Sequence, residues 1–157
     1  MEKKSAALAD DQEPRLQVAA LPYRFRKTFE IMLVSSLDSG RWIVPKGWPM
    51  KGRTSQESAA REAFEEAGLK GEIGADAIGH YHYFKRRKNG SLWHCRVEIF
   101  AMKVKEQRRI WPEKSRRKTK WFPVEKAAML VAERELSDLI LNAPALLGEK
   151  NAGAMAG

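Results

Sequence analysis

The sequence predicts one mixed α/β domain, with its elements in the order β-β-β-α-β-β-β-α. A length of 157 residues fits a single domain with a real core. The content of 43% hydrophobic and 31% charged residues is that of a globular chain, without the long apolar run that a membrane span needs. Extended runs rich in strand-forming residues surround one strongly marked helix. Because strands and helices do not alternate regularly, we expect a mixed sheet.

Three short strands and an ordered loop are expected before that helix. Two extended runs, QVAALPYRF and TFEIMLVSS, are separated by the charged turn at Arg26 and Lys27 and predict an antiparallel pair. A turn at 37–40 leads to a short strand, RWIVP, which ends at Pro45. Residues 46–53 contain two glycines and a proline, which predict an ordered loop.

The helix has clear start and stop signals. Thr54 and Glu57 have the spacing of a capping box, which predicts a helix that begins near Ser55. Gly68 favours a left-handed residue just after the last turn, with Leu69 folding back as its apolar contact. The expected helix is about 13 residues long.

Three more strands and a helical segment are expected after it. The runs GEIGADAIGHYHYF and SLWHCRVEIFAMKV are strand-like, and the Asn89-Gly90 pair between them favours a tight hairpin. Residues 105–118 form a long basic loop that precedes a short strand, KTKWFPV. Residues 124–147 predict one or two amphipathic helices, broken near 133–135.

The two ends of the chain look different from the domain between them. Residues 1–14 lack the apolar region of a secretory signal and are interpreted as a disordered leader, while 149–157 are interpreted as a flexible tail. The domain is therefore expected over 15–148. The single cysteine, Cys95, lies in an alternating segment and is expected to be a buried structural thiol. These features favour a cytoplasmic location.

The positive charge of the chain is local. The turn at 85–88 carries +4, and the segment 103–120 carries nine Lys or Arg against two Glu. Since the whole chain is only +9, the remainder is net negative. Such clustering indicates an anionic partner.

The helix carries an acidic face. At 100° per residue, Glu62, Glu65 and Glu66 fall within one 100° arc, and the apolar residues of the helix lie opposite. Unneutralised carboxylates this close raise each other's pKa, and a hard divalent cation such as Mg²⁺ removes that penalty. One remaining carboxylate can then take a proton from a metal-activated water. The alternative is a glutamate-rich face that is simply solvated.

The stretch 47–69 resembles the Nudix box, whose pattern joins a glycine and a first glutamate to Arg-Glu-aliphatic-x-Glu-Glu-x-Gly-aliphatic. Its fixed identities stand here at the family's spacing as Gly47, Arg61, Glu62, Glu65, Glu66 and Gly68. Two positions depart from the pattern: Arg53 replaces the first glutamate, and Ala63 is smaller than the usual aliphatic residue. The first departure leaves open how many metal ions are held.

The resemblance implies a Nudix-type α/β/α sandwich with a mixed sheet and a loop-helix-loop catalytic motif. It also implies hydrolysis of a phosphoanhydride with Mg²⁺ or Mn²⁺. By the same resemblance, Glu62 and Glu66 are metal ligands and Glu65 is the general base. Arg61 is structural and ties the helix to the preceding loop, and Gly47 lets that loop approach metal and substrate closely.

The resemblance extends over 17–130 to the diphosphoinositol polyphosphate phosphohydrolase branch, which also acts on diadenosine polyphosphates. The stretches that carry it are QVAALPYR, LVSS, RWIVPKG and RKTKWFPVEKA. It implies a polyphosphorylated small molecule as substrate. The candidate phosphate-binding residues are Arg24, Arg41, Lys46, Arg86 and Arg87.

Other functions stay open at this point. A nucleic-acid-binding module fits the sequence pI of 9.8 and the tryptophans Trp93, Trp111 and Trp121 near basic runs. For Trp93 and Trp121, however, the strand patterns favour core packing. A third possibility, removal of pyrophosphate from RNA 5′ ends, would combine phosphoanhydride hydrolysis with nucleic-acid binding. The exact substrate and a homodimer are not decided by the sequence.

Overall fold

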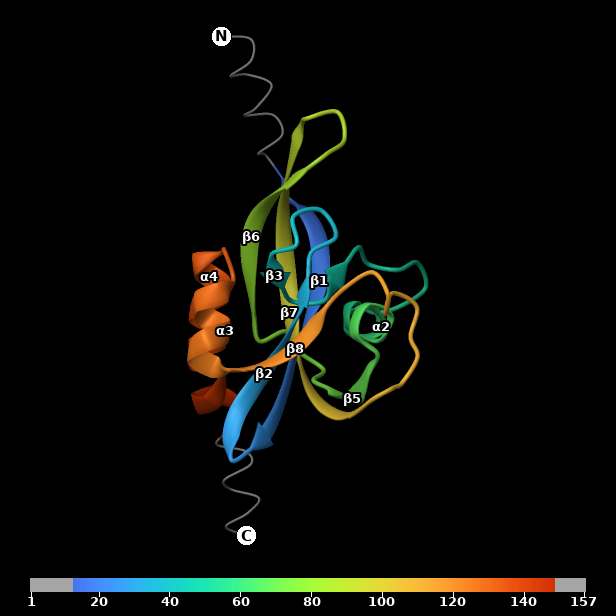
Figure 1. The fold of residues 1–157 in the computed structure, drawn as a ribbon. Helices are drawn as coiled ribbons and strands as arrows, with labels where there is room; N and C mark the ends of the chain where they lie inside the picture. Colours follow the sequence, from blue (N-terminus) through green and yellow to red (C-terminus); the bar gives the residue numbers. More distant parts are fainter. Residues whose placement is uncertain (1–12, 149–157) are drawn as a thin grey trace.

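The computed structural model describes residues 13–148, which form an eight-stranded sheet with helices on both sides. The elements, in chain order, are β1 (Arg15–Arg26), β2 (Thr28–Ser35), β3 (Trp42–Ile43), β4 (Lys46–Gly47), α2 (Ser55–Ala67), β5 (Leu69–Ile73), β6 (Gly79–Arg86), β7 (Leu92–Gln107), β8 (Thr119–Pro123), α3 (Val124–Leu130), α4 (Arg134–Ala143) and the π-helical turn η1 (Pro144–Gly148). Figure 1 shows α2 on one side of the sheet and α3 and α4 on the other. The predicted α/β/α sandwich is confirmed. No helix of the described part is long and apolar enough to cross a membrane.

β1 is the central strand of this sheet. It pairs in parallel with β7 over residues 15–23 and antiparallel with β2 over 23–26. Its first half also pairs with β4. The run 18–21 is completely buried, because helices cover both faces of the strand. The sheet is therefore mixed, as expected. The boundaries expected for a leader and a tail concern residues that lie largely outside 13–148.

Two apolar cores result from the alternation of side chains along β1. Ala19 and Leu21 face α3 and α4, where Leu136 and Ile140 of α4 are completely buried. Ala20 faces the other way, in a cluster that includes Ala63 and Ala67 of α2 together with Met32, Val34, Leu69 and Met102. The apolar face of α2 is thus used for packing, and its acidic face stays available.

Two details differ from the sequence-based expectation. The run 71–84 is not one strand, because β5 and β6 pair with successive parts of the same edge of β7 and residues 74–78 loop out between them. Their ends are held by hydrogen bonds from Gly74 N to Ala101 O and from Ile78 N to Ile99 O, at 2.9 and 2.8 Å. The expected loop after Pro45 begins with β4, which pairs with β1. Both details result from pairing between strands that are distant in the sequence, and local sequence patterns do not predict such pairing.

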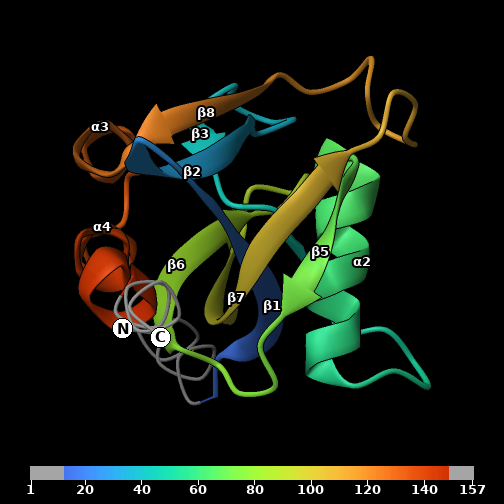
Figure 2. The ribbon, with the colours of Figure 1, turned by 90° about the horizontal axis from the view of Figure 1, so that it is seen from below.

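The ends of α2 follow the predicted signals. Thr54 Oγ1 accepts from Glu57 N at 3.0 Å, and Glu57 Oε1 accepts from Thr54 N at 2.9 Å, which confirms the capping box. Gly68 is left-handed, with φ of 72°, and its N–H donates to the last turn. A Cβ on Gly68 would lie 2.3 Å from the ring of Trp111. The segment between β7 and β8 therefore packs against the end of α2, and Figure 2 shows it passing beside this helix.

Gly68→Ala should destabilise the protein more than Gly52→Ala does. Both glycines have positive φ, so each substitution carries a left-handed penalty of about 1–2 kcal/mol. Only the Cβ at Gly68 meets a neighbour, since nothing lies within 4 Å of a Cβ at Gly52. Urea unfolding at neutral pH measures the difference. Equal losses in the two variants would contradict a tight contact with Trp111.

Candidate active site

The loop before α2 lies directly against the first carboxylate of the acidic face. A Cβ on Gly47 would be 2.3 Å from Glu62 Oε2, so a larger residue here would require the Glu62 carboxylate to move. The loop is held there by β4, in which Gly47 pairs with Val18 of β1. The approach of this loop to metal and substrate stays a prediction; what the structure shows is that Gly47 lies against Glu62.

Glu66 is buried inside this acidic face. It is only 3% exposed, and within the described residues its Oε1 has no hydrogen-bond partner. Burial raises the pKa of Glu66 to about 9; the guanidinium of Arg117 opposes the rise and the carboxyl of Glu62 adds to it. Burial also raises the pKa of Glu62, whose carboxyl is hydrogen-bonded to that of Glu66. Both shifts favour the neutral form of these carboxyls.

This pair fits a divalent cation. A cation at this pair would neutralise both carboxylates and pair with Glu66 Oε1, which has no partner among the described residues. Among residues 13–148, no group of three or more His, Cys, Asp or Glu gathers into a metal site. Two carboxylates are nevertheless what Mg²⁺ commonly takes from a protein, with water and substrate phosphates completing its shell.

Glu65, the candidate base, is held by its own helix. Arg61 Nε donates to Glu65 Oε2 at 2.7 Å, and both side chains are partly exposed. The sequence predicted that Arg61 would tie α2 to the preceding loop, but its guanidinium instead contacts the carboxylate one turn further on. Residues i and i+4 are neighbours on a helix surface, so Glu65 competes with the loop for the guanidinium of Arg61.

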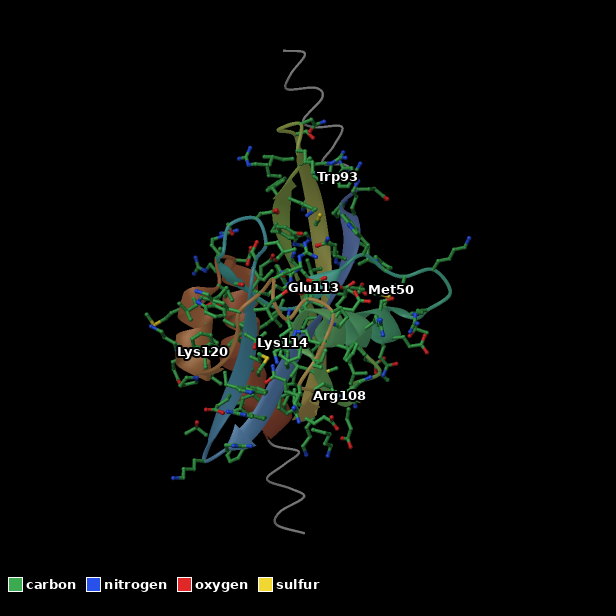
Figure 3. The ribbon with its side chains drawn as sticks, turned by 45° about the vertical axis from the view of Figure 1, so that its right-hand side comes forward. Met50, Trp93, Arg108, Glu113, Lys114 and Lys120 are labelled. Carbon is green, nitrogen blue, oxygen red and sulfur yellow. The ribbon has the colours of Figure 1, made fainter. Side chains whose placement is uncertain are left out.

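Two site residues were missed by the sequence analysis, and both come from the basic segment before β8. Arg117 lies 3.5 Å from Glu66 Oε2 through Nη2 and donates from Nε to Glu113 Oε1 at 2.6 Å. Its Nη1 donates to Ser35 O at 3.0 Å. Glu113 N donates to Glu65 O at 3.0 Å, and Figure 3 shows Glu113 close to α2. The i,i+4 spacing of Glu113 and Arg117 was visible in the sequence, but not the path that brings them to α2.

Three of the predicted phosphate-binding residues share one cavity. Arg41, Lys46 and Arg86 line a cavity of about 510 Å³, together with Ser36, Asp38, Ser39, Ile43, Tyr81, Tyr83, Phe84, Lys85, Leu92 and Glu133. Lys46 Nζ donates to the hydroxyl of Tyr83 at 3.1 Å. Burial lowers the pKa of Lys46, and the Glu66 carboxyl opposes that shift. Lys46 directly precedes Gly47 and feels the charge of Glu66, although none of the three glutamates of the acidic face lines this cavity.

The other two candidates lie elsewhere. Arg24 donates from Nε to Glu30 Oε1 at 2.6 Å and stacks over Trp121 at 4.1 Å. Arg87 stacks over Trp93 at 3.7 Å. Neither arginine lines the cavity. Trp121 packs against the core beside α2, as expected, whereas Trp93 is only partly buried and belongs to neither apolar core.

The chain is similar to known proteins in both sequence and fold. A family model described as NUDIX domain matches residues 13–141. Nudix hydrolase 13, mitochondrial, from Arabidopsis thaliana is 31% identical over 140 residues, which cover 76% of this chain and 68% of that protein. Diphosphoinositol polyphosphate phosphohydrolase 3-beta from Bos taurus is 33% identical over 121 residues, covering 75% and 70%. A C. elegans Ap4A hydrolase, solved as a binary complex, has the same fold, with a TM-score of 0.65, 22% identity and coverage of 86% and 98%.

In the metal-free protein, the free energy of unfolding should decrease as pH rises, because Glu66 is protonated when folded. In Glu66→Gln this decrease should disappear. The folded protein keeps a proton on Glu66 up to a pKa of about 9, whereas an unfolded glutamate releases it near 4.5. The free energy of unfolding therefore falls as pH rises between these values, by more than about 1.4 kcal/mol, which is a tenfold change in the unfolding equilibrium. Urea unfolding in EDTA at pH 5 and pH 8.5 measures it. Glu72→Gln, on an exposed strand, should keep the wild-type slope; a wild-type slope in Glu66→Gln would argue against burial of a protonated carboxyl.

Proposed function

The chain belongs to the Nudix family of pyrophosphohydrolases, and we propose that it hydrolyses a phosphoanhydride bond in a nucleoside polyphosphate or polyphosphorylated small molecule with a divalent metal ion. One observation carries the proposal. Half-buried Glu62 and buried Glu66 have raised pKa values, Glu66 has an oxygen without a partner among residues 13–148, and Lys46, which precedes the Gly47 loop, lines a cavity with Arg41 and Arg86. A divalent cation would neutralise the two carboxylates, and the phosphates of a substrate would pair with the cationic side chains of the cavity.

Each residue has a role in the proposed reaction. Glu62 and Glu66 would hold Mg²⁺ or Mn²⁺, which supplies Lewis-acid polarisation of a phosphoryl oxygen and a more acidic water. Glu65 accepts a proton from the attacking water at a carboxylate oxygen, and Arg61 keeps that carboxylate in place at 2.7 Å. Arg117 holds Glu66 in position and offsets part of its charge.

The cavity supports a substrate with several phosphates. Two arginines and two lysines line it against Asp38 and Glu133, so its walls are net positive. The arginines can donate two hydrogen bonds each to phosphate oxygens. Similarity to a diphosphoinositol polyphosphate phosphohydrolase supports a substrate of the diphosphoinositol or diadenosine polyphosphate type. We place the reaction in the cytoplasm, which a single buried thiol at Cys95 suits.

A second candidate is removal of pyrophosphate from RNA 5′ ends. The observation that favours it is the partly exposed Trp93, on which two arginines stack at the hairpin beside the cavity. Both candidates use the same bond cleavage. An assay with Mg²⁺ against dinucleoside polyphosphates, diphosphoinositols, nucleoside triphosphates and triphosphorylated RNA separates them by the products formed.

Glu65→Gln should lower turnover by about 10²–10⁴-fold, the usual contribution of a general base. The amide keeps the shape of the side chain but accepts no proton, so the fold and substrate binding should persist. Steady-state kinetics on the best substrate of the panel gives kcat, and circular dichroism checks the fold. Glu72→Gln serves as the control because its carboxylate lies on an exposed strand. Turnover like the wild type in Glu65→Gln would exclude this residue as the base.

Arg53→Glu should increase the number of Mn²⁺ ions bound per chain and raise the rate. Arg53 is exposed in the turn before α2, where other members of the family carry a glutamate. A carboxylate there adds an oxygen ligand, and Arg53→Gln removes the charge without adding one. Isothermal titration with Mn²⁺ measures the stoichiometry. If activity collapses in both variants, Arg53 binds substrate instead of marking a lost ligand.

A further inference from the structure

A cluster of aromatic and cationic side chains lies near the turn of the β6–β7 hairpin. The guanidinium carbons of Arg15 and Arg87 lie 3.9 and 3.7 Å from the ring of Trp93. The ring of Trp48 meets Trp93 edge-on, with centroids 5.9 Å apart and an interplanar angle of 76°. Figure 3 shows Trp93 at the hairpin end of the molecule. We call Arg15, Trp48, Arg87 and Trp93 the Trp48–Trp93 cluster.

Among the described residues, no carboxylate neutralises the positive charge of this cluster. Within residues 13–148, no carboxylate pairs with Arg15 or Arg87. A second arginine–tryptophan stack in the same chain is different, because Arg24 over Trp121 is bound to Glu30 at 2.6 Å. That stack is internally neutralised and forms part of the packing beside α2. The Trp48–Trp93 cluster instead offers uncompensated cations around an accessible ring.

The cluster is continuous with the candidate active site. Lys46, Gly47 and Trp48 are consecutive: the first lines the cavity, the second touches Glu62, and the third reaches Trp93. Lys46 contacts Tyr83 of β6, and Trp48 contacts Trp93 of the paired strand β7, so both side chains lie on the same side of this hairpin. Trp48 is 39% exposed. Neither tryptophan lines the cavity itself, and the indole of Trp48 lies two residues along the chain from Lys46, which does.

A ligand for this cluster must have a flat electron-rich ring and phosphates. Nucleobases stack on tryptophan with about 1–3 kcal/mol per base, and guanidinium groups bind phosphate oxygens. An inositol polyphosphate has the phosphates but no ring with a π face. We propose, building on the proposed function, that the Trp48–Trp93 cluster is the subsite for the nucleoside end of a nucleoside polyphosphate. Trp48 stacks on the base, and Arg15 and Arg87 contact the adjoining phosphates.

The test compares two probes that differ by a nucleoside. Binding of adenosine 5′-(β,γ-methylene)triphosphate and of inorganic tripolyphosphate is measured by titration calorimetry with Mg²⁺. Trp48→Ala should weaken nucleotide binding at least about fivefold, as expected for a lost stack of 1 kcal/mol, and leave tripolyphosphate within about twofold. Trp48→Phe should retain most of the affinity. Arg15→Gln and Arg87→Gln should also weaken nucleotide binding.

Matched controls come from the far end of β1. Phe25 is 58% exposed there, and Arg26 is exposed beside it, so Phe25→Ala and Arg26→Gln remove the same kinds of group away from the cluster. Both should bind the two probes like the wild type. If Trp48→Ala changes neither probe, or weakens both equally, the subsite is excluded.

Two further outcomes separate this proposal from the proposed function and identify the source of the nucleoside. A wild-type protein that hydrolyses no phosphoanhydride, yet binds nucleotide through Trp48, would overturn the proposed function and keep the subsite. With active protein, kcat/KM for diadenosine tetraphosphate and for 5′-triphosphorylated RNA is compared between wild type and Trp48→Ala. If Trp48→Ala lowers kcat/KM selectively for one of these two substrates, the subsite is supported and that substrate is the source of the nucleoside. If kcat/KM falls for neither substrate, the subsite is overturned.

Discussion

The burial of the Glu66 carboxyl beside Glu62 is the constraint on which the rest of the site depends. A carboxylate in a site with so little water is costly unless a proton or a cation neutralises it. Burial raises the pKa of both carboxyls, Arg117 supplies a partial counter-charge, and an oxygen of Glu66 stays unpartnered among the described residues. The proposed divalent cation would neutralise this pair, and the proposed phosphates would lie in the net positive cavity lined by Arg41, Lys46 and Arg86.

Packing and chemistry meet at the two ends of α2. At its start, the capping box fixes where the acidic face begins, and β4 presses Gly47 against Glu62. At its end, Gly68 admits the ring of Trp111, and the same segment carries Glu113 and Arg117 over the helix. Contacts that stabilise the fold therefore also set the positions of the carboxylates.

The positive charge of the chain has two different uses. In the segment before β8, Arg117 forms ion pairs with Glu66 and Glu113 inside the protein. Around the cavity and the β6–β7 hairpin, Arg41 and Arg86 line the cavity together with the largely buried Lys46, and Arg87 stacks on Trp93. Net charge alone does not distinguish these uses, because it carries no information on which cations meet a carboxylate after folding.

The sequence by itself determined the fold class, the ends of α2 and the carboxylate arc, because capping, glycine conformation and helical periodicity are local. It also pointed to the cavity residues Arg41, Lys46 and Arg86. Only the tertiary structure decided that Arg24 is consumed by Glu30, that Arg61 holds Glu65, and that the segment before β8 brings Arg117 to Glu66. It also put Trp93 outside the cores. These outcomes depend on contacts between distant parts of the chain. Local sequence patterns allow several partners for each of these side chains, and the pairing of strands and the path of a loop determine which partner each one meets.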